Sequence, residues 1–185
     1  MALIHYPVVN KNGATIASAV TNLDLHDIAR AARTFGVRSF QVVTPLEDQR
    51  ILAGRIVRHW THGAGGDYNP KRREALEHIR ISATLDEAVE AVGRQAGRKP
   101  RTVATCARHY PEAIGYGRLQ RLMQNDHPHM ILMGTAWGLA PEIIGAADHI
   151  LASIGNHETY NHLSVRCAAA IILDRLTTPV GQPRD

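Results

Sequence analysis

The chain has 185 residues, 44% of them hydrophobic, and a formal net charge of +4. This size and apolar content suffice for one core without disulfide or metal support, so we expect a single domain over residues 1–185. No run of about 18 apolar residues occurs, and the first residues lack the basic and apolar regions of a signal peptide, which excludes a transmembrane helix and favours a soluble, cytoplasmic protein. The two cysteines cannot form a disulfide framework and suit a reducing compartment.

Arginine dominates the basic residues. The sequence has 21 lysines and arginines, of which only Lys11, Lys71 and Lys99 are lysines. The guanidinium group is a planar fork of donors that matches phosphate and stacks on bases, so this bias favours a nucleic acid or nucleotide partner. The alternative is a generally basic surface balanced by the 17 acidic residues.

Short β-rich runs alternate with helical patterns along the chain. Strands are predicted at residues 3–9, 39–43, 78–81, 102–105, 129–133 and 149–151. Helices are predicted at residues 24–35, 46–60, 86–95, 114–124, 141–146 and 163–176. This alternation predicts an α/β fold with a mostly parallel sheet flanked by helices on both faces. Ligands in such sheets bind beyond the carboxyl ends of the strands, here in the loops after Val43, Thr105, Met133 and Leu151.

The predicted helix at residues 24–35 has one apolar face and one charged face. Asn22 or Asp24 is expected to cap its start. The charged stripe consists of His26, Arg30 and Arg33. Arg30 is either a functional residue or the partner of Asp27 in an i,i+3 pair on a solvated face, and the pattern alone favours the pair.

A basic segment with a glycine-rich centre covers residues 55–73, which read RIVRHWTHGAGGDYNPKRR. The glycines predict a mobile loop, and Trp60 and Tyr68 are candidates for stacking an unpaired base. Clustered basic residues are the electrostatic footprint of RNA binding. The predicted RNA-binding residues are Arg33, Arg55, Arg58, Lys71, Arg72 and Arg73. The alternative is a surface helix that ends in a flexible turn.

The apolar strand predicted at residues 129–133 runs into a loop that contains Gly134 and Gly138. Glycine lets the backbone approach a ligand closely or adopt a positive φ. The alternative is an ordinary strand-to-helix turn in which Trp137 fills part of the core. The pattern is shorter than a complete dinucleotide-binding fingerprint, so by itself it leaves both interpretations open.

A polar loop leads into the last predicted helix, whose alanines and isoleucines predict that it is largely buried or faces a partner chain. The free N–H groups at its start favour polar or anionic ligand atoms. Asn161 is alternatively a simple N-cap. His157, Glu158 and His162 have the residue types of a metal cluster, but they meet no metal-ligand spacing, and we expect no metal.

Three segments, taken together and in this order, resemble the motifs of the SPOUT superfamily of RNA methyltransferases, in particular its ribose-methylating SpoU branch. Residues 28–37 read IARAARTFGV and are similar to the first motif. Residues 131–139 read ILMGTAWGL and match the second, an apolar strand followed by a glycine-containing loop. Residues 163–171 read LSVRCAAAI and match the third, a loop that enters a helix. The resemblance covers nearly the whole chain.

The resemblance implies an S-adenosyl-L-methionine (SAM)-dependent methyltransferase acting on tRNA or rRNA as a homodimer, with a C-terminal trefoil knot and no appended RNA-binding module. SAM would lie bent in the knot. The implied cofactor-binding residues are Thr105, Cys106, Ala107, Met133, Gly134, Thr135, Gly138, Ile154, Gly155, Leu163 and Ser164. The implied catalytic residues are Arg30, Asn22 and Ser164. Arg30 matches the arginine that assists the ribose hydroxyl, and positioning suits it better than proton removal because a guanidinium group carries hydrogen-bond donors and no acceptor.

Three positions depart from the family pattern. Asp24 stands where the first motif usually has Asn, Ala136 lies near the acidic residue of the second, and Ser164 replaces the Asn of the third. These departures leave a ribose 2′-OH only slightly ahead of a base nitrogen as the methyl acceptor, and they keep a non-catalytic RNA-binding protein as the alternative. A doubly wound nucleotide enzyme is disfavoured because neither GxGxxG nor a P-loop follows any strand.

Overall fold

The main sheet has six parallel strands. A computed structural model describes residues 1–155 and 160–178. The strands follow the order β5-β4-β1-β7-β6-β8, and neighbouring strands pair in parallel. Their bounds are β1 Ala2–Ile4, β4 Phe40–Val43, β5 Ile79–Ser82, β6 Arg101–Thr105, β7 His129–Gly134 and β8 His149–Leu151. The α/β fold with a mostly parallel sheet is therefore confirmed.

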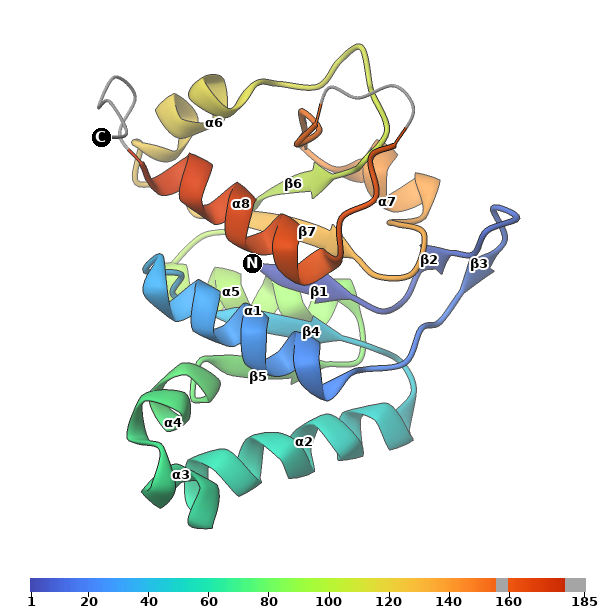
Figure 1. Cartoon of the computed structure of the whole chain (residues 1–185). Helices are drawn as coiled ribbons and strands as arrows, with labels where there is room; N and C mark the ends of the chain where they lie inside the picture. Colours follow the sequence, from blue (N-terminus) through green and yellow to red (C-terminus); the bar gives the residue numbers. More distant parts are fainter. Residues whose placement is uncertain (156–159, 179–185) are drawn as a thin grey trace.

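Helices cover both faces of this sheet (Figure 1). Their bounds are α1 Asn22–Thr34, α2 Glu47–His62, α3 Ala64–Tyr68, α4 Pro70–Leu76, α5 Leu85–Ala96, α6 Tyr116–Met123, α7 Pro141–Ala146 and α8 Val165–Thr177. Helices α1, α2, α4, α6 and α8 share one apolar cluster with the sheet, and α5 and α7 share another. Alternation along the strands supplies both clusters: Leu3 faces the first, and Ile4 faces the second. Among the described residues, no helix has the length and apolar character needed to cross a membrane.

The strand predicted over residues 3–9 is wrong in its extent. It ends at Ile4, and the chain continues as β2 (Val8–Val9), which pairs antiparallel with β3 (Thr15–Ile16) outside the main sheet. Pro7 has no N–H to donate to a strand ladder. The N–H of Val9 donates instead to the carbonyl of Gly138, 3.0 Å away. The segment after β1 is thereby held against the loop after β7.

The N-cap of α1 is Thr21, not Asn22 or Asp24 as predicted. The Thr21 side chain accepts a hydrogen bond from the Asp24 N–H at 3.1 Å, and its backbone is extended. Asn22 is already the first helical residue, so its side chain cannot serve as the cap. The carboxylate of Asp24 is therefore available for other contacts.

The mobile loop predicted at the centre of residues 55–73 is also wrong, because this segment forms α3 and α4. Gly65 and Gly66 are buried. A Cβ atom on Gly65 would lie 2.8 Å from Cε3 of Trp60, and one on Gly66 would lie 2.6 Å from the Trp60 carbonyl oxygen. These glycines allow close packing of α3 against the end of α2, which a sequence pattern does not distinguish from flexibility.

Candidate functional site

A cavity of about 560 Å³ lies at the carboxyl ends of β6, β7 and β8. The loops after Thr105, Met133 and Leu151 form part of its wall, where the sheet topology predicts ligand binding, whereas the loop after Val43 does not reach it. The start of α1 and the chain entering α8 form the rest. Besides residues singled out from the sequence, the wall includes Ser18, Ala19, Thr21, Arg108, Tyr116, Ala152, Ser153, Val165, Ala168 and Ile172.

The loop after β7 brings bare backbone to the cavity wall. A Cβ atom on Gly134 would lie against the Leu139 nitrogen and 2.7 Å from the Gly138 carbonyl carbon. Gly138 has φ +110°, and Ala136 has φ 51° although it is not glycine. The Trp137 N–H donates to the Val9 carbonyl at 3.0 Å, which anchors the loop. The second motif thus forms a tight, fixed turn whose glycines are sterically required.

Three hydrogen-bonded side chains run from the core to the cavity wall. His5 Nδ1 lies 3.0 Å from Ser18 Oγ, and Ser18 Oγ lies 2.5 Å from Thr135 Oγ1. Ser18 and Thr135 line the cavity, and His5 is completely buried. Burial lowers the pKa of His5 to about 4, so its imidazole is neutral near pH 7.

The available protons determine which group donates in each of these hydrogen bonds. Thr135 donates its only hydroxyl proton to the Ile4 carbonyl, 3.0 Å away, and therefore accepts from Ser18. Ser18 in turn accepts from the Nδ1–H of His5. Nε2 of His5 is buried without a hydrogen-bond partner in the described part of the chain, and in this arrangement it carries a lone pair and no proton. These hydrogen bonds hold the hydroxyl groups of Ser18 and Thr135 in place at the cavity wall.

A ladder of charges leads from the cavity wall to the surface. Asp24 lines the cavity with its side chain 9% exposed, and its Oδ1 accepts from Arg166 Nη1 at 3.0 Å. Arg166 Nε lies 3.5 Å from Asp27 Oδ2. Arg30 Nη1 lies 3.9 Å from Asp27 Oδ1 at the outer end. The ladder joins α1 to α8 and compensates the buried charge of Asp24.

The third segment is fixed to the cavity by two polar side chains. Ser164, and not Asn161, is the N-cap of α8: its Oγ accepts from the Cys167 N–H at 3.3 Å. Asn161 Nδ2 donates to the Ala107 carbonyl at 3.0 Å. Asn161 therefore ties the loop before α8 to the end of β6, across the cavity wall.

The residues that the resemblance implies for the cofactor gather at this cavity. Its wall contains Thr105, Cys106, Ala107, Met133, Gly134, Thr135, Gly138, Ile154, Leu163 and Ser164. Gly155 lies next to the wall, where a Cβ atom would be 3.3 Å from Asn161 Oδ1. Segments from three separate strand ends and α8 thus meet at one place.

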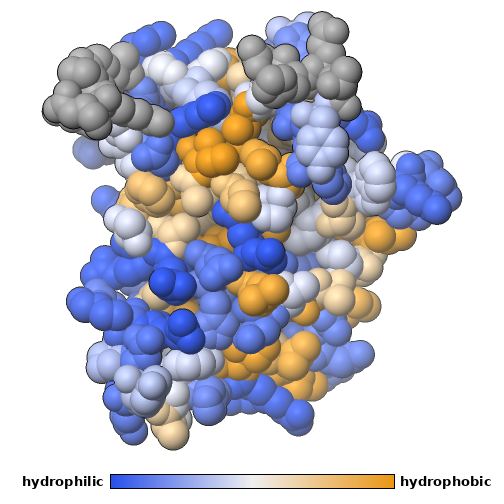
Figure 2. Space-filling model, viewed as in Figure 1, coloured by the Kyte–Doolittle hydropathy of each residue, from blue (hydrophilic) through white to orange (hydrophobic). Residues whose placement is uncertain are grey.

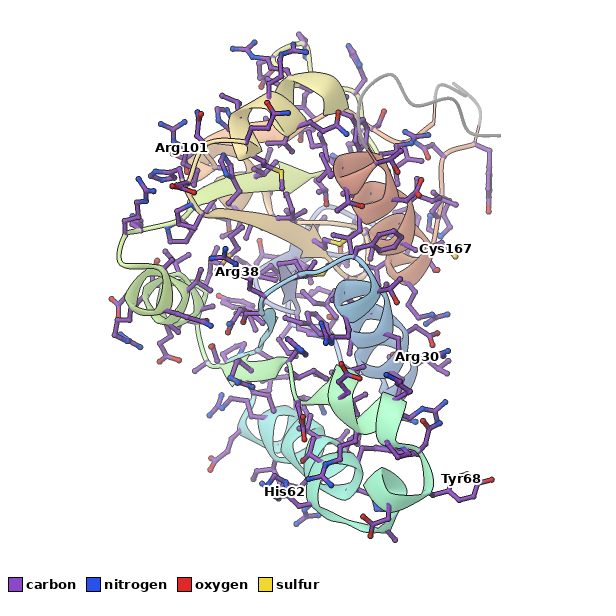
Figure 3. All side chains as sticks on the ribbon, turned by 90° about the vertical axis from the view of Figure 1, so that its left-hand side faces the viewer. Arg30, Arg38, His62, Tyr68, Arg101 and Cys167 are labelled. Atoms are coloured by element: carbon purple, nitrogen blue, oxygen red, sulfur yellow. The ribbon has the colours of Figure 1, made fainter. Side chains whose placement is uncertain are left out.

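Two of the residues implied as catalytic lie outside the cavity of this chain. Asn22 is exposed at the first position of α1. The Arg30 side chain is 59% exposed, and it lies on the same outer side of the molecule as Cys167 of α8 (Figure 3). Ser164, the third, lines the cavity. Arg30 and the cavity do not meet within this chain.

The six basic residues predicted to bind RNA have different surroundings. Ion pairs join Arg33 and Lys71 to Glu74, and Arg73 to Glu77. The guanidinium of Arg72 lies 4.8 Å from the ring centroid of Trp60, so it covers the ring that was expected to stack a base. Arg55 and Arg58 are exposed on α2, and the described residues offer them no ion-pair partner. Tyr68 is 89% exposed (Figure 3).

Sequence reasoning missed His5, Ser18 and Tyr116. His5 directly follows β1, so the rule that ligands gather at strand ends could have found it. Ser18 and Tyr116 stand in no motif, and only the folded chain brings them to the cavity. Of the residues considered for a metal, His157 and Glu158 lie outside the described residues. Within residues 1–155 and 160–178, no group of three His, Cys, Asp or Glu side chains has a metal-binding arrangement.

Comparison with known proteins gives a match over most of the chain. A family described as "SAM-dependent RNA methyltransferase" matches residues 1–178. The chain is 45% identical over 95% of its length to a "tRNA (guanine-N(1)-)-methyltransferase" of Oleidesulfovibrio alaskensis, and it covers 41% of that protein. It is 41% identical, also over 95% of its length, to an uncharacterized protein of Aquifex aeolicus, of which it covers 86%. The chain thus spans about two-fifths of the longer relative.

Comparison with solved structures identifies the same architecture. The crystal structure of the Aquifex aeolicus TrmH/SpoU tRNA modifying enzyme matches with a TM-score of 0.53. The match has 17% sequence identity and covers 86% of this chain and 70% of that one. At this identity the likeness shows the fold alone, and it confirms the SPOUT-type fold that the three motifs imply.

Proposed function

Because the chain belongs to the family of SAM-dependent RNA methyltransferases, we propose that it transfers the methyl group to a ribose 2′-OH or a base nitrogen of cytoplasmic tRNA or rRNA. The observation that carries the proposal is the convergence of the second and third motifs on one cavity at the strand ends. The N1 atom of guanine, which the name of the longer relative gives as its acceptor, is one such base nitrogen.

The cavity fits SAM in size and in chemistry. Small-molecule sites have volumes of about 300–1,000 Å³, and this one has about 560 Å³. The turn at Gly134 and Gly138 provides close backbone approach, Met133 and Ile154 provide apolar surface, and Ser164 marks the polar start of α8. When bound, SAM supplies an electrophilic methyl group, and the protein's own task is to align the nucleophile and exclude water.

We include a homodimer in the proposal, because Arg30 lies away from the cavity of its own chain. Apolar side chains form patches over α8 and over α2 on the face shown in Figure 2. Leu23 of α1 is 59% exposed, and Leu163 at the cavity edge is 44% exposed. A partner packed against α1 and α8 would cover these side chains and bring Arg30 of one protomer toward the cavity of the other. There the guanidinium would orient the acceptor and stabilise negative charge on it.

The basic surface of α2 supports the RNA part of the proposal. Arg55 and Arg58 are exposed, and they are the predicted RNA-binding residues least occupied by other side chains of the described chain. Arg33, Lys71 and Arg73 already pair with glutamates, so contacts with phosphate would require exchange of those partners. We therefore place the first phosphate contacts at Arg55 and Arg58.

Isothermal titration tests the cofactor assignment first. Purified protein should bind SAM or its demethylated product at micromolar concentrations, and NAD and ATP should not compete. The bound protein is then incubated with radiolabelled SAM and separate pools of tRNA and rRNA, and digested nucleosides identify the methylated atom. No SAM binding by folded protein would contradict the proposal and favour the non-catalytic RNA-binding alternative.

A further inference from the structure

Three aromatic rings lie in a row at the mouth of the cavity. The ring centroids of Trp137 and His162 are 6.1 Å apart, and those of His162 and Tyr160 are 6.2 Å apart. Trp137 and His162 line the cavity. Trp137 is 59% exposed and Tyr160 is 72% exposed, so neither ring is a core plug. Large aromatic surface left in water beside a ligand cavity is a feature of binding sites.

The backbone fixes Trp137 in this outward position. Its N–H donates to the Val9 carbonyl, and the N–H of Gly138 donates to the Thr135 carbonyl at 2.9 Å. The preceding Ala136 has φ 51°, a left-handed conformation that an alanine adopts at some energetic cost. The turn that displays the solvent-exposed indole is preorganised for a flat partner, because its backbone is already fixed and loses little freedom on binding.

The other tryptophan has opposite surroundings. Trp60 is partly buried, its ring is covered by the Arg72 guanidinium, and the His26 ring meets it edge-on at 5.2 Å. Side chains of the same chain thus already contact the Trp60 ring. Of the two tryptophans, only Trp137 has a ring surface open to a ligand at the cavity.

We propose that the indole of Trp137 is a stacking surface that holds one unpaired nucleobase of the RNA substrate at the mouth of the cavity. The rings of His162 and Tyr160 flank it, because they are inclined by 46° between Trp137 and His162 and by 70° between His162 and Tyr160. The inference rests on the proposed function and adds to it the conformation of the substrate. Within a duplex both faces of a base are covered by its neighbours, so the nucleotide held there must lie in a single-stranded loop or be extruded from a helix. Arg108, exposed on the cavity wall and without an ion-pair partner among the described residues, is placed to contact the phosphate beside that base.

Tryptophan fluorescence tests the stacking directly, because the chain has two tryptophans. In the Trp60→Phe variant, Trp137 is the sole tryptophan. A single-stranded oligoribonucleotide of about ten nucleotides is expected to quench its emission by base stacking, and the same strand annealed to its complement is expected to leave it nearly unchanged. The Trp137→Phe variant, in which Trp60 alone reports, is the matched control and should show no quenching.

Affinity measurements on the same oligonucleotide complete the test. Trp137→Ala should weaken single-strand binding roughly tenfold, and Trp137→Phe should retain most of the affinity, because one stacked base contributes on the order of a factor of ten. Equal quenching by duplex and single strand, or no quenching while SAM still binds in calorimetry, would overturn the stacking surface and leave the proposed function intact. Quenching of Trp137 by SAM alone, with no further change on adding RNA, would also overturn it. If the unmodified protein did not bind SAM at all, that result would contradict the proposed function itself.

Discussion

Arg166 of α8 donates a hydrogen bond to Asp24 of α1 at 3.0 Å, although 142 positions separate them in the sequence. Asp24 is nearly buried, so Arg166→Met would leave its carboxylate without its closest counter-charge. We expect a loss of about 1–3 kcal/mol in the free energy of unfolding, measured by urea denaturation. The double variant Asp24→Asn with Arg166→Met should recover most of this loss, because no buried charge remains. A single variant as stable as the unmodified protein would show that the pair has no structural role.

His5 should make the protein sensitive to acid. Its pKa is about 4 in the folded chain because of burial, against about 6.5 when unfolded. Between these values the unfolded chain binds a proton that the folded chain does not, so the free energy of unfolding falls as the pH drops from about 6.5 to about 4, by about 3 kcal/mol in total. In NMR titrations of the folded protein, the His5 ring signals should stay constant above pH 5. A midpoint near the unfolded value would contradict the buried, neutral imidazole.

Gly134→Ala should damage both stability and cofactor binding. The added methyl group would meet backbone atoms of Gly138 and Leu139, which cannot move aside as a side-chain end can. We expect a loss of about 1–3 kcal/mol in stability and at least tenfold weaker SAM binding by calorimetry. Gly145→Ala in α7 is the matched control, because its Cβ would meet no atom within 4 Å, and it should be neutral or slightly stabilising. Equal behaviour of the two variants would refute the steric argument.

Removing the charges of Arg55 and Arg58 should weaken RNA binding in a salt-dependent way. Each lost phosphate contact lowers the slope of log affinity against log salt by about 0.7 for single strands, so the double alanine variant should lose about 1.4. Arg94→Ala is a suitable control, since Arg94 pairs with Glu90 on α5, on the opposite face of the sheet. The measurement is fluorescence anisotropy at several salt concentrations. An unchanged slope would remove α2 from the RNA-binding surface.

Local sequence patterns predicted most of the fold. They failed at elements whose type or extent depends on tertiary contacts. The alternation of strands and helices was visible in the sequence, because each element has its own hydrophobic period. Gly65 and Gly66 suggested a loop, yet they lie in a helix, where the missing Cβ atoms let this helix pack closely against Trp60. The first strand was predicted too long, because the apolar Val8 and Val9 follow a proline that ends the ladder.

For the site, the sequence predicted which loops lie at the cavity, but it did not predict which side chains form hydrogen bonds there. The strand-end rule placed the loops after Thr105, Met133 and Leu151 correctly at the cavity. The hydrogen bonds from His5 to Ser18 and from Ser18 to Thr135 have no local signal, because the last pair is 117 positions apart. The trefoil knot, the dimer and the residue roles drawn from the resemblance stay predictions.

The position of β1 at the centre of the sheet has a consequence for synthesis of the chain. Leu3 pairs with Val42 on one side and with Met133 on the other. One edge of β1 can therefore pair with β4 early in synthesis. The other edge stays unpaired until β7 has been synthesised. At about 5–20 residues per second, roughly 5–20 s pass between the two events. During that interval an apolar strand edge is exposed on the ribosome, where it is a target for chaperones and for aggregation with other nascent chains.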